Sequence, residues 1–500
     1  MSAQQGQTTT AVIRLVSLAA TLAVALAMIA APPRAAASVD QFTVLDPTPS
    51  LLNGESAARR SDILDRLQSL GVDSVRIQVQ WRVLAPAPHS STKPPAFDGS
   101  DPGSYPAHAF DVLDSIVRGV DARGMKALLV PTGPIPDWAS STGGGSLFDP
   151  DPVEFERFVQ ALGERYDGTC VPPKCAAGPD GEALPRVDQW SVYNEPNLKT
   201  FLRPQRASDG RTVSGFIYRR LFLAAQRALA NTGHRKDLLL IGETAPSRGS
   251  ASTAPLKFLR QVFCLSPDYH LLRGCQPIEA DGWAHHPYNP HIPPWEAPKQ
   301  VHRSIISIGS INRLVNVLRK AARAGATVQR LPVYVTEYGI ESYPQGGFGV
   351  SPQRQAEFLG DAEYLLYRNP WVSSFAQYLL DDDRNPSLLL SFQTGLRFAN
   401  GFPKPSYDAF PITLVARQRK QGGVEIWGHV RPGQGPYQVE VRFRDGDAGT
   451  GQALLDLQTD RAGYFDFGSA FAQGREWQAT CQLPDGSVVQ GPFVRSYRFN

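Results

Sequence analysis

The chain has 500 residues, of which 42% are hydrophobic and 19% are charged, and its formal net charge is +3 at pH 7. A globular protein of this length and composition buries ample apolar core. Its charge is nearly balanced, so the composition excludes the strongly basic surface with which many proteins bind nucleic acid.

The first 37 residues differ from the rest of the chain. Arg14 precedes the apolar run LVSLAATLAVALAMIAA, which ends in the small-residue stretch APPRAAAS. A basic residue, an apolar run and an A-x-A-like cleavage site are typical of a secretory signal peptide, so we expect cleavage near Ala37 and a secreted, extracellular protein. An uncleaved membrane anchor is the alternative, because the run approaches the ~20 residues that span a bilayer. No other stretch is long and apolar enough, so no membrane contact is expected after cleavage.

The five cysteines agree with export, because disulfides persist in oxidising compartments. Cys170 and Cys175 lie in a loop rich in Pro and Gly, and Cys264 and Cys275 bracket a second irregular segment, so each pair is expected to form a local disulfide. Cys481 is left over. The alternatives are free thiols or zinc ligands, although CVPPKC has no second Cys or His pair nearby that completes a tetrahedral site.

Residues 38–411 alternate short β-type runs with helical patterns. In RRSDILDRLQSLG, Ile63, Leu64, Leu67 and Leu70 share one helical face and Gly71 ends the helix. The strands are predicted at residues 42–47, 74–81, 126–133, 187–196, 238–246, 281–288, 332–339 and 372–380. Further helices are predicted at residues 110–124, 152–166, 215–231, 311–325 and 351–369.

Eight strands separated by helices predict an α/β fold, a (β/α)₈ TIM barrel with extended loops. A doubly wound open sheet is the competing fold. It normally carries a glycine-rich phosphate turn after its first strand, and the sequence contains neither G-x-G-x-x-G nor G-x-x-x-x-G-K-[ST].

Residues 412–500 lose the helical periodicity. Seven short alternating runs, from ITLVARQ to VVQGPFVRSY, are separated by turns rich in Gly and Asp, which predicts a small antiparallel β-sandwich as an accessory domain. Trp427 and Trp477 are expected in its core rather than in a glycan-binding surface.

The active site of such a barrel lies at the C-terminal ends of the strands, so reactive residues at those ends are the candidates. Glu195 closes the fourth strand in WSVYNEPN, and Glu337 closes the seventh strand in VYVTEYG. We expect the two carboxyl groups to face one another across the barrel mouth. A carboxyl pair of this kind is what glycoside hydrolysis requires.

Three residues are candidates for supporting this pair. Arg76, expected at the end of the second strand, is placed to keep Glu337 ionised, and Tyr288, ending the sixth strand, is placed to donate to it. Asn194 is a candidate for binding a sugar hydroxyl. Strict alternation sends Asn194 and Glu195 to opposite faces, so we predict a distortion at the end of the fourth strand.

These motifs, taken together and in this order, resemble glycoside hydrolase clan A, the retaining barrel enzymes that include families 5 and 39. They are N-E-P after the fourth strand, the second Glu after the seventh, Arg on the second and H-P-Y in HHPY after the sixth. The resemblance covers residues 40 to 410. It implies that Glu195 is the general acid/base and Glu337 the nucleophile, with Asn194, Arg76 and His286 among the supporting positions, and Tyr288 beside them. It also implies carboxyl groups about 5–5.5 Å apart.

The eighth strand departs from the clan. Where many members have a Trp that forms the floor of the sugar subsite, this chain has FAQYLLDD, so Tyr378 or Gln377 is expected in that role. The stretch GFPKPSYDAF favours a relative similar to family 39 over family 5.

Other polar and aromatic residues have weaker signals. Trp81, Trp138 and Trp283 lie near strand ends, and Trp138 in GPIPDWAS is the candidate for stacking on substrate. Glu243, Asp137 and Glu341 also lie near strand ends, without a matching motif. His285, His286 and His291 raise the question of a metal site, but no H-E-x-x-H helix accompanies them, and we expect no metal and no cofactor.

We therefore expect a secreted retaining glycosidase that cleaves β-linked oligo- or polysaccharides. The alternatives are a non-catalytic glycan-binding protein on the same barrel, and a serine hydrolase, which needs a G-x-S-x-G elbow that the sequence lacks. The sequence leaves the sugar, endo or exo action and the oligomeric state open.

Overall fold

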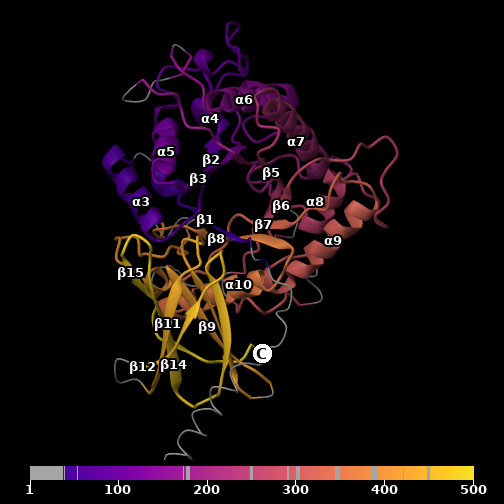
Figure 1. Ribbon diagram of the computed structural model, residues 1–500. Helices are drawn as coiled ribbons and strands as arrows, with labels where there is room; N and C mark the ends of the chain where they lie inside the picture. Colours follow the sequence, from indigo (N-terminus) through magenta and orange to yellow (C-terminus); the bar gives the residue numbers. More distant parts are fainter. Residues whose placement is uncertain are drawn as a thin grey trace, which may run out of the picture. The chain divides into compact units, whose positions relative to one another are not determined.

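A computed structural model describes residues 38, 40–52, 55–172, 174–175, 181–247, 252–289, 292–299, 304–343, 349–384, 392–420, 422–446 and 451–499 (Figure 1). The predicted signal peptide, residues 1–37, lies outside them. The chain divides into two compact units, one of Ser38–Pro411 with Arg431–Gly433, the other holding Ile412–Val430 and Gln434–Asn500. Within the described ranges, none of the helices has the length and apolar character needed to cross a membrane.

The first unit is a closed barrel. Eight parallel strands among the described residues pair in the order β1 to β8, and β8 pairs with β1, which confirms the predicted (β/α)₈ barrel. The strands are β1 Phe42–Asp46, β2 Ser74–Gln80, β3 Lys126–Thr132, β4 Gln189–Ser191, β5 Leu238–Thr244, β6 Gly282–His285, β7 Val333–Val335 and β8 Val372–Tyr378.

Helices follow the strands and surround the barrel (Figure 1). They are α2 Thr48–Leu52, α3 Ala57–Ser69, α4 Trp81–Leu84, α5 Asp111–Asp121, α6 Pro152–Arg165, α7 Ser214–Asn231, α8 Pro255–Val262, α9 Ile311–Arg323, α10 Pro352–Tyr367 and α11 Pro405–Ala409, with short 3₁₀ turns at Pro102–Ser104, Asp137–Ala139 and Ile308–Ser310.

Local sequence explains where several of these helices begin. Ser56 caps α3 by accepting a hydrogen bond from Arg59 N, and Asp151 caps α6 by accepting from the backbone of Val153 and Glu154. Side-chain caps of this kind satisfy backbone N–H groups that have no partner within the helix.

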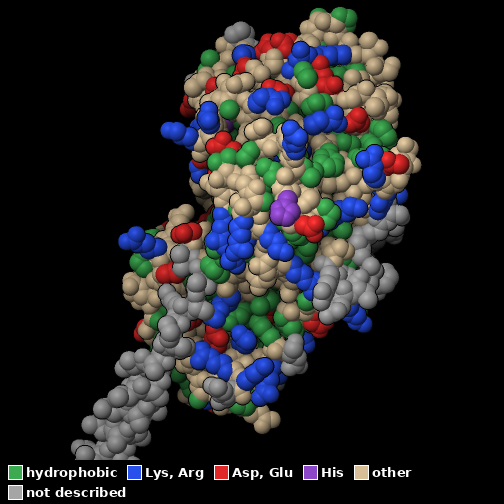
Figure 2. Space-filling model, turned by 90° about the vertical axis from the view of Figure 1, so that its right-hand side faces the viewer, with side chains coloured by type: hydrophobic (Ala, Val, Ile, Leu, Met, Phe, Trp, Pro, Cys, Tyr) green, Lys and Arg blue, Asp and Glu red, His purple; other side chains and the backbone are tan. Residues whose placement is uncertain are grey.

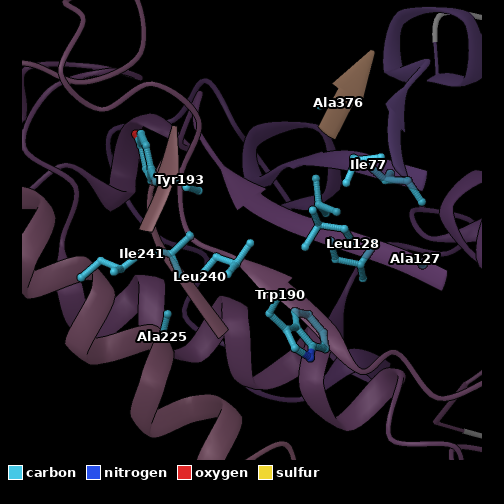
Figure 3. Close-up of a cluster of buried hydrophobic side chains, with 14 of the residues drawn as sticks. Ile77, Ala127, Leu128, Trp190, Tyr193, Ala225, Leu240, Ile241 and Ala376 are labelled. Atoms are coloured by element: carbon cyan, nitrogen blue, oxygen red, sulfur yellow. The ribbon is translucent and has the colours of Figure 1, made fainter. Parts of the chain in front are cut away.

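The barrel core lies between the strands and the helices. In β2, Val75, Ile77 and Val79 are buried on the side that faces the helices. Figure 3 shows Ile77 near Leu128 of β3, with Trp190 of β4 in the same cluster. The alternate residues of β2 face the interior of the barrel, so its polar side chains point toward the barrel axis.

The second unit consists of two antiparallel sheets. One has the order β13-β10-β9, and the other has the order β12-β11-β14-β15, with β16 paired to β14. The strands are β9 Ile412–Gln418, β10 Val424–Val430, β11 Gln438–Asp445, β12 Gln452–Gln458, β13 Tyr464–Ser469, β14 Arg475–Gln482, β15 Val488–Gln490 and β16 Val494–Arg495. Ile426 of one sheet and Trp477 of the other belong to one buried cluster, so the unit is the predicted β-sandwich. Trp427 and Trp477 are both buried.

The described residues contain the two predicted disulfides, Cys170–Cys175 and Cys264–Cys275, and Cys481 is a buried free thiol. On the face shown in Figure 2, Lys and Arg side chains are interspersed with Asp and Glu, in line with the near balance of charge.

Candidate active site

The end of β4 is distorted, as the alternation of Asn194 and Glu195 predicts. The strand is shorter than the predicted 187–196, because it ends at Ser191 and the backbone then turns: Tyr193 has φ +64° and Glu195 has φ +41°. Left-handed backbone is uncommon for residues with a side chain and concentrates at functional sites. With this turn, both Asn194 and Glu195 border the same cavity.

Glu195 and Glu337 face one another in that cavity, which has a volume of about 640 Å³. One oxygen of Glu195 lies within 4.8 Å of one oxygen of Glu337, although 141 residues separate them in the chain. Glu337 lies two residues after the end of β7, and its side chain is 7% exposed, against 14% for Glu195.

Arg76 is the centre of the charge network beneath this pair. It is the third residue of β2 rather than its end, and its fully buried side chain reaches the strand ends. Its Nη1 donates to Glu337 Oε1 at 2.6 Å and also to Asp46, and its Nη2 donates to Asn194 Oδ1 at 2.7 Å and to Glu243 Oε2 at 2.5 Å. One guanidinium thus contacts residues of β1 and β5 and of the segments that follow β4 and β7.

His286 joins both glutamates of the pair to Glu243. Its Nδ1 lies 2.9 Å from Glu195 Oε1 and 3.5 Å from Glu337 Oε2, and its Nε2 lies 2.8 Å from Glu243 Oε2. Burial lowers the pKa of His286, but the negative charge of Glu337 and the hydrogen bonds to Glu195 and Glu243 outweigh it and raise that pKa to about 10. The ring is therefore an imidazolium at neutral pH, with a hydrogen on each nitrogen.

Two opposing effects act on Glu337. Burial and the charges of Glu195 and Asp46 raise its pKa, while His286 and Arg76 lower it, and the result is a pKa of about 7. Tyr288 Oη also donates to Glu337 Oε2 at 3.1 Å. Glu337 therefore titrates near neutral pH, well above the usual pKa of a glutamate.

Glu243 and Asp46 belong to this network, although the motifs did not select them. A register shift in β5 between Ile241 and Thr244, with Glu243 at φ +46°, turns the Glu243 carboxylate toward Arg76, and Ser191 Oγ donates to it at 2.6 Å. Burial raises the pKa of Glu243, but Arg76 and His286 lower it to about 2. The sequence signal for Glu243 was an acidic residue inside the otherwise apolar strand LLLIGET. For Asp46 the signal was its position at the end of the predicted strand FTVLDP.

Gly242, next to Glu243, is required by this distortion. Its φ is +121°, and a Cβ there would lie 2.7 Å from the Trp283 ring and 2.8 Å from Ala284 O. Any larger residue would strain the segment that presents Glu243.

The predicted aromatic residues separate into two groups. Tyr288 and Tyr378 line the cavity, with ring centroids 6.2 Å apart in an edge-on arrangement. Gln377, the other candidate for the floor, is buried and donates to backbone carbonyls, including Thr394 O at 2.7 Å. Trp138 does not line the cavity: it packs edge-on against Trp81, and its indole N–H donates to Pro86 O.

Trp81 and Trp283 are buried in the core. Glu341 lines the cavity and accepts from Gln393 N at 2.8 Å, whereas Asp137 pairs with Arg82 away from it.

Glu195, His286 and Glu337 form the cluster of metal-ligand type in the described part of the chain. Both ring nitrogens of His286 lie within hydrogen-bond distance of carboxylate oxygens, Nδ1 with Glu195 and Nε2 with Glu243. His285 is engaged by Thr244 Oγ1 at 2.9 Å and Ile306 O at 3.1 Å, and burial lowers its pKa to about 3. His291 lies outside the described residues.

Comparison with known proteins gives a likeness of fold. No protein-family model matches the sequence, and no curated protein matches it. Among solved structures, a family 39 glycoside hydrolase from Bacteroides cellulosilyticus is similar, with a TM-score of 0.52 and 15% identity over 88% of this chain and 82% of that chain. The shared feature is the fold.

Two further solved structures are similar at lower scores. A family 1 β-glucosidase from Thermotoga maritima has a TM-score of 0.44 and 14% identity over 73% of this chain and 94% of its own. An endo-1,4-β-mannanase from Rhizomucor miehei has a TM-score of 0.42 and 12% identity over 74% and 94%.

Proposed function

We propose that the protein is a secreted retaining glycoside hydrolase that cleaves O-glycosidic bonds of β-linked sugars. The observation that carries this proposal is the pair of carboxyl groups after β4 and β7, with oxygens within 4.8 Å of each other in one cavity. Retaining glycosidases use carboxyl groups about 5–5.5 Å apart, whereas inverting enzymes separate them by about 6.5–9.5 Å to admit a water. The fold shared with a family 39 glycoside hydrolase and the two disulfides support the activity and the export, respectively.

The surroundings of the two glutamates support a division of roles. Glu337 accepts from Arg76 and Tyr288, which stabilise a carboxylate and fix its orientation. Glu195 borders the cavity with His286 as its cationic neighbour. The donors to Glu337 favour its carboxylate form and support it as the nucleophile, and the position of Glu195 at the cavity beside His286 supports it as the general acid.

The reaction then follows in two displacements. Glu195 gives its proton to the glycosidic oxygen while a Glu337 oxygen attacks the anomeric carbon, so the bond to the leaving group breaks and a glycosyl ester forms. Glu195, now a carboxylate, takes a proton from the water that attacks the same carbon and releases Glu337. Asn194 and Tyr378 border the cavity at positions suited to the sugar's hydroxyls and ring.

The stereochemistry of the product tests this proposal. A panel of 4-nitrophenyl β-glycosides selects the sugar, and NMR then identifies the first anomer released from the best substrate. We expect the β-anomer, and initial release of the α-anomer would contradict the double displacement.

The variant Glu195→Ala tests the acid/base assignment. It should cleave glycosides with poor leaving groups about 10²- to 10⁴-fold more slowly, because no group protonates the departing oxygen. Glycosides with 2,4-dinitrophenol as the leaving group should lose much less in the first step, and azide should restore turnover by giving a β-glycosyl azide. An equal loss on all leaving groups would assign the acid role elsewhere.

A further inference from the structure

The wall of the active-site cavity is chemically divided. The part formed by the segments after β6, β7 and β8 presents Tyr288, Glu337, Glu341 and Thr394, which offer donors and acceptors. The part formed by α2, α4, α5 and the segment after Glu195 presents mostly apolar side chains, Leu52, Val83, Leu84, Val112, Leu113 and Phe201, and its polar residues are Thr48, Thr200 and Gln80, which directly precedes α4. A sugar ring on this second side would find few partners for its hydroxyl groups, and unpaired polar groups are unfavourable against an apolar wall.

The apolar wall adjoins the proposed general acid. Leu198 N donates to Glu195 O at 2.9 Å, and Phe201 N donates to Leu198 O at 3.2 Å, so the turn that presents Glu195 also presents apolar side chains to the cavity. In a double displacement the sugar is transferred to Glu337, and the leaving group departs beside the acid. The apolar wall therefore borders the place of the leaving group.

Two residues of this wall lie partly open at the cavity. Val83 is 72% exposed and Val112 is 37% exposed, and both line the cavity that holds the glutamate pair. Large apolar side chains left open in a concave site are typical of ligand-binding surfaces. An apolar group seated against them would bury them.

We propose that the leaving group is an apolar alcohol with an alkyl chain, so that the substrate is a β-glycoside of the kind found in glycolipids rather than a chain of sugars. This inference rests on the proposed function for the place of the bond that breaks. It narrows the substrate class, because the sugar is recognised on the Glu337 side and the alkyl chain on the Glu195 side.

The test compares methyl and octyl β-D-glucoside, both below the micellar concentration. Their binding is measured by calorimetry on the Glu337→Gln variant, and their kcat/KM is measured on the wild type. Each buried methylene is expected to strengthen binding about two- to fourfold, so the octyl glucoside should bind at least about 100-fold more tightly than the methyl glucoside.

Two further variants locate the effect. Val83→Asn combined with Val112→Asn should lower the octyl-to-methyl ratio about tenfold, because the wall becomes polar. Val153→Asn, an equally simple change at a 57% exposed position outside the cavity wall, should leave the ratio as it is.

Octyl glucoside that binds no more tightly than methyl glucoside overturns the inference, whether or not either compound is cleaved. The inference is also overturned if neither the double variant nor Val153→Asn changes the octyl-to-methyl ratio. Tight octyl binding that depends on Val83 and Val112, without turnover of any 4-nitrophenyl or alkyl β-glycoside, supports the apolar site and instead counts against the proposed hydrolysis.

Discussion

Two buried arginines of the barrel unit have very different surroundings. In the described contacts, Arg165 of α6 pairs with one acidic residue, Asp114 of α5. Its Nε and Nη2 donate to the two carboxylate oxygens at 2.8 Å and 2.5 Å. Tyr166 Oη donates to the same carboxylate at 2.9 Å. Arg76 instead contacts three carboxylates, those of Asp46, Glu243 and Glu337. The first pair is balanced in charge, and the second group has a surplus of negative charge.

The comparison separates a structural ion pair from the charge network of the proposed active site. A balanced pair is neutral as a unit and lies where no ligand reaches it, since neither Arg165 nor Asp114 lines the cavity. A surplus of buried carboxylates is unfavourable unless protons or a second cation compensate for it, and here the raised pKa values of His286 and Glu337 supply that compensation. Proton uptake and release at such a site is what acid–base chemistry uses.

The largest expected effect is the loss of turnover in Glu337→Gln. The amide cannot attack the anomeric carbon, so kcat should fall by at least about 10⁴-fold, while the fold and sugar binding persist. The control is Glu357→Gln on α10, outside the cavity wall, which should retain kcat within about twofold. Calorimetry measures sugar binding, and steady-state kinetics measure kcat. A Glu337→Gln protein of nearly normal activity would contradict the assignment of Glu337 as the nucleophile.

Breaking the balanced pair should give the opposite pattern. Asp114→Asn leaves the Arg165 guanidinium buried without its counter-charge, so the free energy of unfolding should fall by about 3–5 kcal/mol. The kcat below the melting range should stay within about twofold, because the pair does not border the cavity. Urea unfolding monitored by fluorescence measures the free energy of unfolding. A loss of kcat without a loss of stability would contradict the structural role of the Arg165–Asp114 pair.

A smaller effect is expected from Glu243→Gln, which removes one negative charge from the unbalanced group. The pKa of His286 should fall from about 10, because one of the carboxylates that raises it is gone. We expect kcat/KM to fall about 10- to 100-fold through the altered position and charge of His286. NMR titration measures the pKa of His286, which a merely destabilised protein would leave unchanged. As a control, Ser191→Ala removes one donor to Glu243 and should shift the pKa of His286 less than Glu243→Gln does.

The smallest effect is a change of rate with pH. Burial raises the pKa of Glu337 to about 7, and the proposed nucleophile attacks only as a carboxylate. The kcat/KM should therefore fall about fivefold between pH 7 and pH 6, as Glu337 takes up a proton. A rate that does not change between pH 7 and pH 6 would show that the ionisation of Glu337 does not limit the reaction, and would contradict its role as the nucleophile.

Sequence reasoning found the barrel and most of the site because both depend on short-range patterns. Alternation in SVRIQVQW and helical spacing in RRSDILDRLQSLG depend on neighbours in the chain, and the predicted β2 and α3 agree with the structure within two residues. Glu195 and Glu337 could be predicted because each lies within four residues of the end of a strand. The bounds of β4 were wrong, since the turn at Tyr193 and Glu195 depends on contacts with other strands, such as Tyr193 N donating to Pro131 O.

The sequence by itself determined the strand order, the eight-fold alternation and which acidic residues stand at strand ends, because these follow from periodicity and from the geometry of parallel strands. Only the tertiary structure decided that Glu243 turns toward Arg76, that Trp138 packs in the core and that one side of the cavity is apolar. These properties depend on side chains that lie far apart in the chain and meet only when the barrel closes. The charge balance of a buried group and the lining of a cavity depend on many such side chains together, so no local sequence pattern predicts them.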